Sequence, residues 1–61
     1  MKKTLKINYR DYEMLIVSTR KEGIECYLVY VDHHGIAKRG EALSERMAIT
    51  IGMNFINQIA I

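Results

Sequence analysis

The first residues of the chain alternate between polar and apolar side chains. In residues 4–9, TLKINY, every second residue is apolar and the residues between them are polar. This period of two is typical of a β-strand that has one buried face and one exposed face. The polar pair Arg10–Asp11 follows directly and suits a turn. The sequence therefore predicts that the chain begins with a half-buried strand and a turn.

Two longer apolar segments come next, at residues 13–19, EMLIVST, and residues 24–31, IECYLVYV. Both segments are rich in β-branched and aromatic residues, which favour strands. The residues between them, RKEG, include Gly23, and glycine takes a positive φ without steric cost. We therefore expect residues 20–23 to form a four-residue hairpin loop that pairs the two strands in antiparallel orientation.

A further turn is predicted at residues 32–35, DHHG. Asp32 can accept a hydrogen bond from the backbone that follows it, and Gly35 can adopt the left-handed conformation. Residues 36–39, IAKR, then suit a short edge strand. We expect Gly40 to end this strand, because glycine weakens the interior of a strand.

The last segment, residues 47–61, MAITIGMNFINQIAI, contains no charged side chain and fits two patterns. As a strand, its residues alternate in size and polarity; as a helix from about Glu41 to residue 59, its polar residues form one stripe. Gly52 weakens the helix by up to ~1 kcal/mol. Against this, EALSERMA is strong helix-forming sequence, and about 20 residues without a turn is too long for an ordinary strand. We therefore expect a helix over residues 41–59.

Together these elements predict an α+β fold. The expected architecture is an antiparallel meander of three to four strands with one C-terminal α-helix packed on one face. The sequence has no proline and no low-complexity or linker composition, so we expect residues 1–61 to form a single domain. A domain of this length buries only about 60% of the surface that its unfolded chain exposes, so its core is small.

The apolar residues exceed what a single core of this kind needs. Residues 13–19 and 24–31 are apolar on both faces, although one helix covers only one face. The apolar arc of the helix is also wider than the ~100° that one contact with a sheet requires. Burying roughly 600 Å² more per chain is worth on the order of 15 kcal/mol before association costs. We therefore expect a homodimer or tighter oligomer rather than the alternative, a compact monomer with a fully buried helix. The candidate interface residues are Ile49, Ile51, Met53, Phe55, Ile56, Ile59, Val29 and Val31.

The compartment is inferred from cysteine usage and hydropathy. Cys26 is the only cysteine, which excludes an intramolecular disulfide and fits a reducing compartment. The apolar stretches lack the length of a membrane span, and the N-terminus lacks the layout of a signal peptide. We therefore expect a cytoplasmic protein that has no membrane partner.

The candidates for chemistry are few. A metal site could be formed by Asp32, the two histidines after it and Cys26, because these side chains can bind zinc. The usual spacings of zinc ligands are missing, however. Neither a nucleophile in a recognisable setting nor a phosphate-binding glycine loop is found, and no second carboxylate is positioned by spacing. We expect turn histidines and a core cysteine. We therefore predict no enzyme activity, no catalytic residues, no cofactor and no metal.

Basic residues support an alternative function, nucleic-acid binding through the sheet. The residues ECYLVYVDHHGIAKRGEALSERMAI, about half the chain, resemble the three-stranded DNA-binding arm domains of phage integrases in their order of strand, glycine turn, short strand and helix. The uncharged helix departs from that pattern, and Glu13, Glu22 and Glu25 oppose a phosphate-binding surface. The candidate nucleic-acid contacts are Lys2, Lys6, Arg10, Lys38 and Arg39. The alternation of side chains along a strand places the first three of these residues on one face of the first strand.

The whole chain resembles another class. In its 61 residues, its MKK start, its lack of proline and its surplus of apolar side chains, it is similar to the short accessory proteins with which bacteriophages block host enzymes and anti-phage defence systems. The resemblance implies a non-catalytic homodimer in the host cytoplasm that inhibits a bacterial protein by stoichiometric binding. A DNA-binding accessory or regulatory protein is the alternative.

Overall fold

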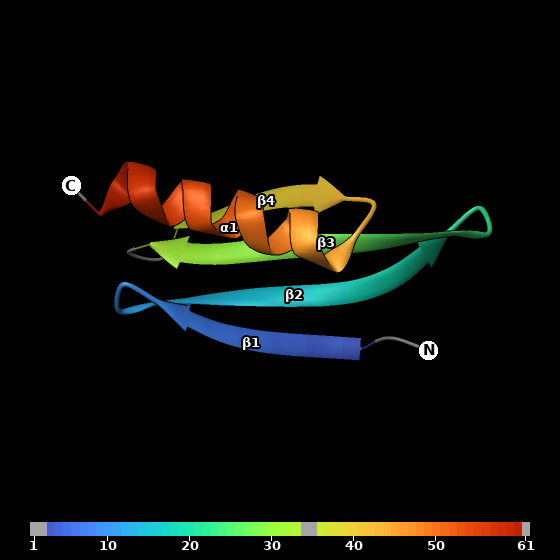
Figure 1. The fold of residues 1–61 in the computed structure, drawn as a ribbon, viewed down its shortest axis with the longest axis horizontal. Coiled ribbons are helices and arrows are strands. Elements are labelled where there is room, and N and C mark those ends of the chain that lie inside the picture. The colour runs from blue at the N-terminus through green and yellow to red at the C-terminus, as the bar shows by residue number, and fades with distance from the viewer. Residues whose placement is uncertain (1–2, 34–35, 61) are drawn as a thin grey trace.

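The computed structural model describes residues 3–33 and 36–60. An antiparallel meander of four strands, in the order β1-β2-β3-β4, forms one layer, and one helix lies across one side of it (Figure 1). The α+β fold predicted from the sequence is therefore confirmed. The elements are β1 (Lys3–Tyr9), β2 (Tyr12–Lys21), β3 (Ile24–His33), β4 (Ile36–Ala42) and α1 (Glu45–Ile59).

Two-residue turns connect the first three strands. Arg10 and Asp11 have φ of 52° and 67°, and Glu22 and Gly23 have φ of 53° and 78°. A positive φ at both central residues is the signature of the type I′ turn, whose twist matches that of paired strands. The predicted turn at Arg10–Asp11 and the positive φ of Gly23 are confirmed. The predicted four-residue loop is wrong, because β2 and β3 continue pairing as far as Lys21 and Ile24.

The prediction that Gly40 ends the last strand is also wrong. β4 continues to Ala42, and Gly40 pairs with Val29 of β3. A Cβ atom on Gly40 would lie 2.7 Å from Cγ2 of Ile51 and 3.3 Å from the ring of Phe55. Glycine is therefore needed here because the helix lies directly on the edge strand. The prediction of a turn at residues 32–35 is wrong for residues 32 and 33, which belong to β3. The positive φ expected of Gly35 concerns a residue outside the described ranges.

The last segment is a helix, as predicted, but the helix begins four residues later than predicted. Residues 41 and 42 belong to β4, and the side chain of Ser44 accepts a hydrogen bond of 3.2 Å from the backbone N–H of Met47. This contact caps the first turn of α1, so Glu45 is its first residue. Gly52 lies near the middle of the helix, where a Cβ atom would be 2.6 Å from Sδ of Met14 and 2.9 Å from Cγ2 of Val29.

The hydrophobic core lies between α1 and one face of the sheet. Met14 and Val29 are fully buried, and the helix contributes Ala48 and Ile56 at 0% exposure. α1 packs against β2, β3 and β4 and lies to one side of β1 (Figure 1). The helix therefore covers one face of the sheet, and that face carries the core of the domain.

Hydrogen bonds from the β1–β2 turn reach the end of the helix. The guanidinium of Arg10 donates to Oδ1 of Asn57 at 2.9 Å and to the carbonyl oxygen of Ala60 at 3.1 Å. The hydroxyl of Tyr9 also donates to Oδ1 of Asn57, at 3.1 Å. A cation at a helix C-terminus interacts favourably with the helix dipole and with carbonyls that lack a partner in the helix. These contacts fix the turn against α1.

Candidate functional site

The face of the sheet opposite the helix, called the free face below, carries a second set of apolar side chains. Side chains alternate between the two faces of a strand, so the residues next to the core positions point away from the helix. Four apolar side chains that point this way are half-buried, and none of the four belongs to the core cluster or to the side chains packed against it. No element within residues 3–33 and 36–60 covers them. These residues, called the apolar ladder, are Leu15, Val17, Leu28 and Tyr30.

Strand pairing brings the ladder together. Leu15 pairs with Tyr30 across β2 and β3, and Val17 pairs with Leu28. Directly opposed residues in antiparallel strands have Cβ atoms about 4.5–5.5 Å apart, so the four side chains form one continuous strip. The next pair on this face includes Cys26, which is 7% exposed and whose thiol donates to the carbonyl oxygen of Ile24 at 3.6 Å.

Polar residues of the outer strands border the ladder. On β1, Lys6 pairs with Leu15 and Thr4 pairs with Val17. On β4, Arg39 pairs with Tyr30 and Glu41 pairs with Leu28. The free face therefore has an apolar centre and a polar rim, which is the usual anatomy of a protein–protein interface.

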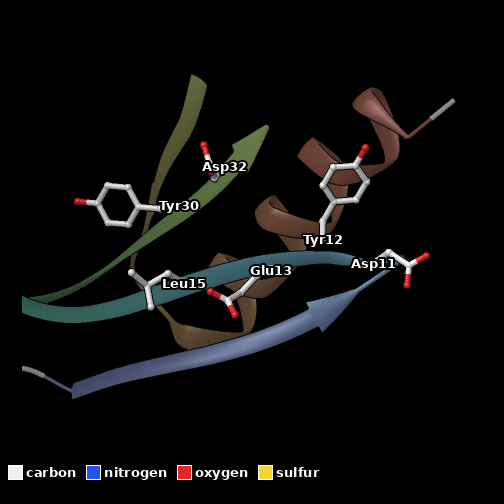
Figure 2. Close-up of a pocket in the computed structure, with 6 residues that line it drawn as sticks. All are labelled: Asp11, Tyr12, Glu13, Leu15, Tyr30 and Asp32. Carbon is white, nitrogen blue, oxygen red and sulfur yellow. The ribbon is translucent and has the colours of Figure 1, made fainter. Parts of the chain in front are cut away.

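A hollow lies at the end of the ladder near the β1–β2 turn. It has a volume of about 340 Å³, and Leu15 and Tyr30 belong both to its lining and to the ladder (Figure 2). Glu13 of β2 and Asp32 of β3 carry exposed carboxylates, as does Asp11 in the turn. No hydrogen bond or ion pair among the described residues engages these three carboxylates. The lining of this acidic hollow consists of Asp11, Tyr12, Glu13, Leu15, Tyr30 and Asp32.

The structure separates the residues proposed as nucleic-acid contacts. Lys6 and Arg39 lie on the free face, at opposite edges of the sheet. Arg10 lies in a turn, where it is bonded to the end of α1, instead of continuing the face of β1. Lys38 lies on the helix side, with its ammonium 5.9 Å from the ring centre of Phe55. Lys2 falls outside the described ranges.

The candidate oligomer residues lie on the helix side of the sheet. Val29, Val31 and Ile56 have 0% exposure, so the chain's own core leaves no surface of these side chains for a second chain. The other five are half-buried and pack against that core: Ile49, Ile51, Met53, Phe55 and Ile59.

Sequence reasoning missed two exposed apolar residues next to the helix start. Leu43 is 72% exposed and Met47 is 57% exposed. For Met47 the available signal was the spacing of the small residues Ala48 and Gly52, which lie four residues apart and are buried where the helix contacts the sheet. Met47 lies beside these two positions on the helix rather than in line with them.

Metal-ligating groups do not gather in the part of the chain that the structure describes, where no three His, Cys, Asp or Glu side chains could hold a metal ion together. The side chain of His33 and the whole of His34 fall outside that part, so the candidate set around residues 32–34 is not described as a whole. No helix within residues 3–33 and 36–60 is long and apolar enough to cross a membrane.

Comparisons with known proteins identify no relative. No protein-family model matches the chain, and searches of curated proteins and of solved structures find no match. The features of the described chain that bear on function are therefore the free face of the sheet and the acidic hollow at its end.

Proposed function

We propose that this protein acts without catalysis, by stoichiometric binding of another protein to the apolar ladder on the free face. The observation that carries the proposal is the partial exposure of four apolar side chains in the centre of a sheet, on the face that the helix leaves uncovered: Leu15, Val17, Leu28 and Tyr30. In an antiparallel sheet with one face in water, that face normally carries polar side chains. A contiguous apolar strip on such a face, bordered by charges, is typical of an interaction site.

The class of target follows from the resemblance to short phage accessory proteins. That resemblance implies a bacterial enzyme or an anti-phage defence complex as the partner, and the host cytoplasm as the place of action. In this proposal the protein is a homodimer whose free faces bind the target. The partner inserts apolar or aromatic side chains over the ladder, because such anchors dominate the binding free energy of protein interfaces.

Nucleic-acid binding is the second candidate, and Lys6 and Arg39 on the free face are the observation in its favour. The same face also carries the carboxylates of Glu13, Asp32 and Glu41. Carboxylates beside a phosphate backbone repel it, and phosphate contacts supply most of the affinity for nucleic acid. The mixture of charges therefore favours a protein partner.

The proposal can be tested by affinity capture from a bacterial lysate. The tagged protein should retain a partner at fixed stoichiometry, and the complex should tolerate salt because its contacts are mainly apolar. Leu28→Lys and Leu15→Lys each place a charge in the ladder and should abolish capture. Thr50→Lys adds the same charge on the exposed side of α1 and should leave capture unchanged. Circular dichroism verifies that each variant is folded.

Two results would argue against this function. Capture that survives both ladder variants would move the binding site away from the free face. Sub-micromolar binding to duplex DNA, lost on charge reversal of Lys6 and Arg39 and falling with salt at a log–log slope of about −0.9 per phosphate contacted, would favour the nucleic-acid alternative.

A further inference from the structure

The outer edge of β4 has no neighbouring strand. β4 is last in the order β1-β2-β3-β4, so one of its edges pairs with β3, and no element within residues 3–33 and 36–60 pairs with the other (Figure 1). In an edge strand, unpaired backbone N–H and C=O groups point outward and form a template for another strand. The outer edge of β4 is therefore a surface to which a further strand can bind.

The helix places apolar side chains beside this edge. Met47, Ile51 and Phe55 are spaced four residues apart and form one stripe along α1, called the apolar stripe. A Cβ atom on Gly40 of β4 would contact Ile51 and Phe55, so the stripe lies on the β4 side of the helix. Met47, at its start, is 57% exposed, and Leu43 between β4 and α1 is 72% exposed. The edge is therefore bordered by exposed apolar surface.

The charges of β4 are complementary to those of a second β4 in one register. Two antiparallel copies related by a twofold axis pair about one residue, because paired side chains share a face of the sheet. With Gly40 on the axis, Arg39 of each copy lies opposite Glu41 of the other, and opposite charges in such a pair are stabilising. Both side chains are exposed, and no hydrogen bond or ion pair among the described residues engages them.

Other registers and the other edge are less favourable. An axis at Lys38, Arg39 or Glu41 would place two like charges directly opposite each other, which is destabilising. β1, the other outer strand, carries Lys3 and Lys6 but no acidic residue, so two copies of β1 would form no ion pair. Lysines on an edge strand also discourage pairing with another chain. The described charges therefore favour β4, in the register centred on Gly40.

We propose that β4 pairs with β4 of a second copy of this chain, antiparallel and centred on Gly40, so that two sheets form one continuous eight-stranded sheet. This inference rests on the proposed function in one respect, the homodimer, and names the edge at which the two copies meet. The twofold axis is perpendicular to the sheet, so both helices lie on one side of it and both free faces on the other. The dimer therefore presents two apolar ladders side by side to its target.

The position of the helix leaves room for this pairing. A Cβ atom on Gly52 would contact Met14 of β2 and Val29 of β3, so α1 crosses the sheet between these two strands. In the dimer the two crossing points are four strand spacings apart, roughly 19 Å. Packed helices are about 8–10 Å apart, so the backbones of the two helices do not clash. The apolar stripes of the two copies face each other across the axis.

Charge reversals test the register, with the dimer dissociation constant measured by light scattering over a dilution series. Arg39→Glu and Glu41→Arg each place like charges opposite each other twice, and each should raise that constant at least about tenfold. The two changes in one chain exchange the charges and should restore the dimer. Lys3→Glu reverses a charge on the other outer strand and should leave the constant unchanged. A dimer that tolerates either reversal at position 39 or 41 would overturn the pairing.

A mixture of the two single variants tests the same register in another way. Every Arg39→Glu chain is acidic at both positions and every Glu41→Arg chain is basic at both, so each is complementary to the other. Mixing them should yield a heterodimer, identified by its mass in native mass spectrometry, although neither forms a stable dimer alone. Circular dichroism verifies that both are folded. Absence of the heterodimer would overturn the register.

Amide hydrogen exchange tests the pairing without any substitution. In the dimer the outward amides of residues 38–42 bond to the second copy, so their exchange should slow several-fold as the protein concentration is raised through the dissociation constant. The amides of residues 3–9, on the other outer strand, should not respond to concentration. Exchange in β4 that is independent of concentration, in a protein that does dimerise, would overturn the proposal.

The outcomes separate a failure of this inference from a failure of the proposed function. A monomeric protein that still captures a partner through the apolar ladder would overturn the pairing and leave the ladder as the binding site. A dimer with the predicted response to charge reversal, which captures no protein through the ladder, would support the pairing and overturn the proposed function. A dimer that Met47→Lys dissociates and neither charge reversal weakens would place the interface on the helix alone and overturn the pairing.

Discussion

Gly52 determines how closely α1 approaches the sheet. A Cβ atom at this position would lie 2.6 Å from Sδ of Met14 and 2.9 Å from Cγ2 of Val29, both in the core. Alanine is the better helix former by ~1 kcal/mol, but overpacking a core costs typically about 1–3 kcal/mol. We expect Gly52→Ala to lower the free energy of unfolding by about 1 kcal/mol, measured by urea denaturation. Asn54→Ala, on the exposed side of the same helix, should slightly raise it, and a stabilising Gly52→Ala would contradict the close packing.

The hydroxyl of Tyr27 donates a hydrogen bond of 3.2 Å to Oε1 of Glu25. Partial burial, and then the negative charge of Glu25, raise the pKa of Tyr27 above its ordinary value of 10.0. Because this pKa is higher in the folded state, the stabilisation is present below pH 10 and is lost as the pH rises through the folded pKa. We expect Glu25→Gln to lower the pKa of Tyr27 without restoring the ordinary value, as followed by NMR of the tyrosine ring carbons. An unchanged pKa would show that Glu25 has no part in it.

At the scale of elements, Arg10 joins the β1–β2 turn to the end of α1. Its guanidinium makes two hydrogen bonds, to Asn57 and to the carbonyl oxygen of Ala60. A hydrogen bond contributes about 0.5–1.5 kcal/mol, so we expect Arg10→Ala to lower the free energy of unfolding by about 1 kcal/mol. Amide hydrogen exchange should accelerate in the last turn of the helix. Arg46→Ala removes an arginine at the exposed start of α1 and should change stability by less than about 0.5 kcal/mol, so equal effects of the two changes would contradict this contact.

Sequence patterns predicted the elements better than their ends. The alternation in residues 4–9 and the apolar runs after it were sufficient for the meander, because strand pairing and turn chemistry are local. The extension of β4 through Gly40 was not predictable, since it depends on the approach of Ile51 from the helix. The start of α1 was not predictable either, because any of residues 41–44 could precede the first turn, and in the structure Ser44 is the residue that caps it.

The candidate site was predicted only in part. The pattern indicated that β2 and β3 are apolar on both faces, and the structure places those side chains on opposite sides of the sheet. The pattern did not indicate which face the helix covers. Val29 and Val31 were therefore grouped with interface candidates, although they lie in the core. The acidic hollow was missed because Asp32 lies on a different strand from Glu13 and lines the same hollow as Asp11 and Glu13 only in the folded sheet.

At the scale of the whole molecule, the exposed Leu43 and Met47 give the proposed homodimer a surface distinct from the free face. Light scattering behind size exclusion at micromolar concentration should give twice the chain mass of 7.1 kDa. Met47→Lys should produce a folded monomer, because a charge in an apolar contact is costly to bury. Asn54→Lys, on the exposed side of the helix, should remain dimeric. A wild-type protein that is monomeric across dilution would contradict the dimer.

In the proposed complex a protein partner covers the free face, and hydroxyl-radical footprinting of the captured complex measures whether it does. The method reads the exposure of individual side chains. We predict that oxidation of Leu28 and Tyr30 falls at least several-fold in the complex relative to the free protein, because the partner excludes water from the ladder. Oxidation of exposed Thr50 and Asn54 on the far side of α1 should not change. Unchanged oxidation of Leu28 and Tyr30, with protection confined to the helix, would show that the partner does not bind the free face.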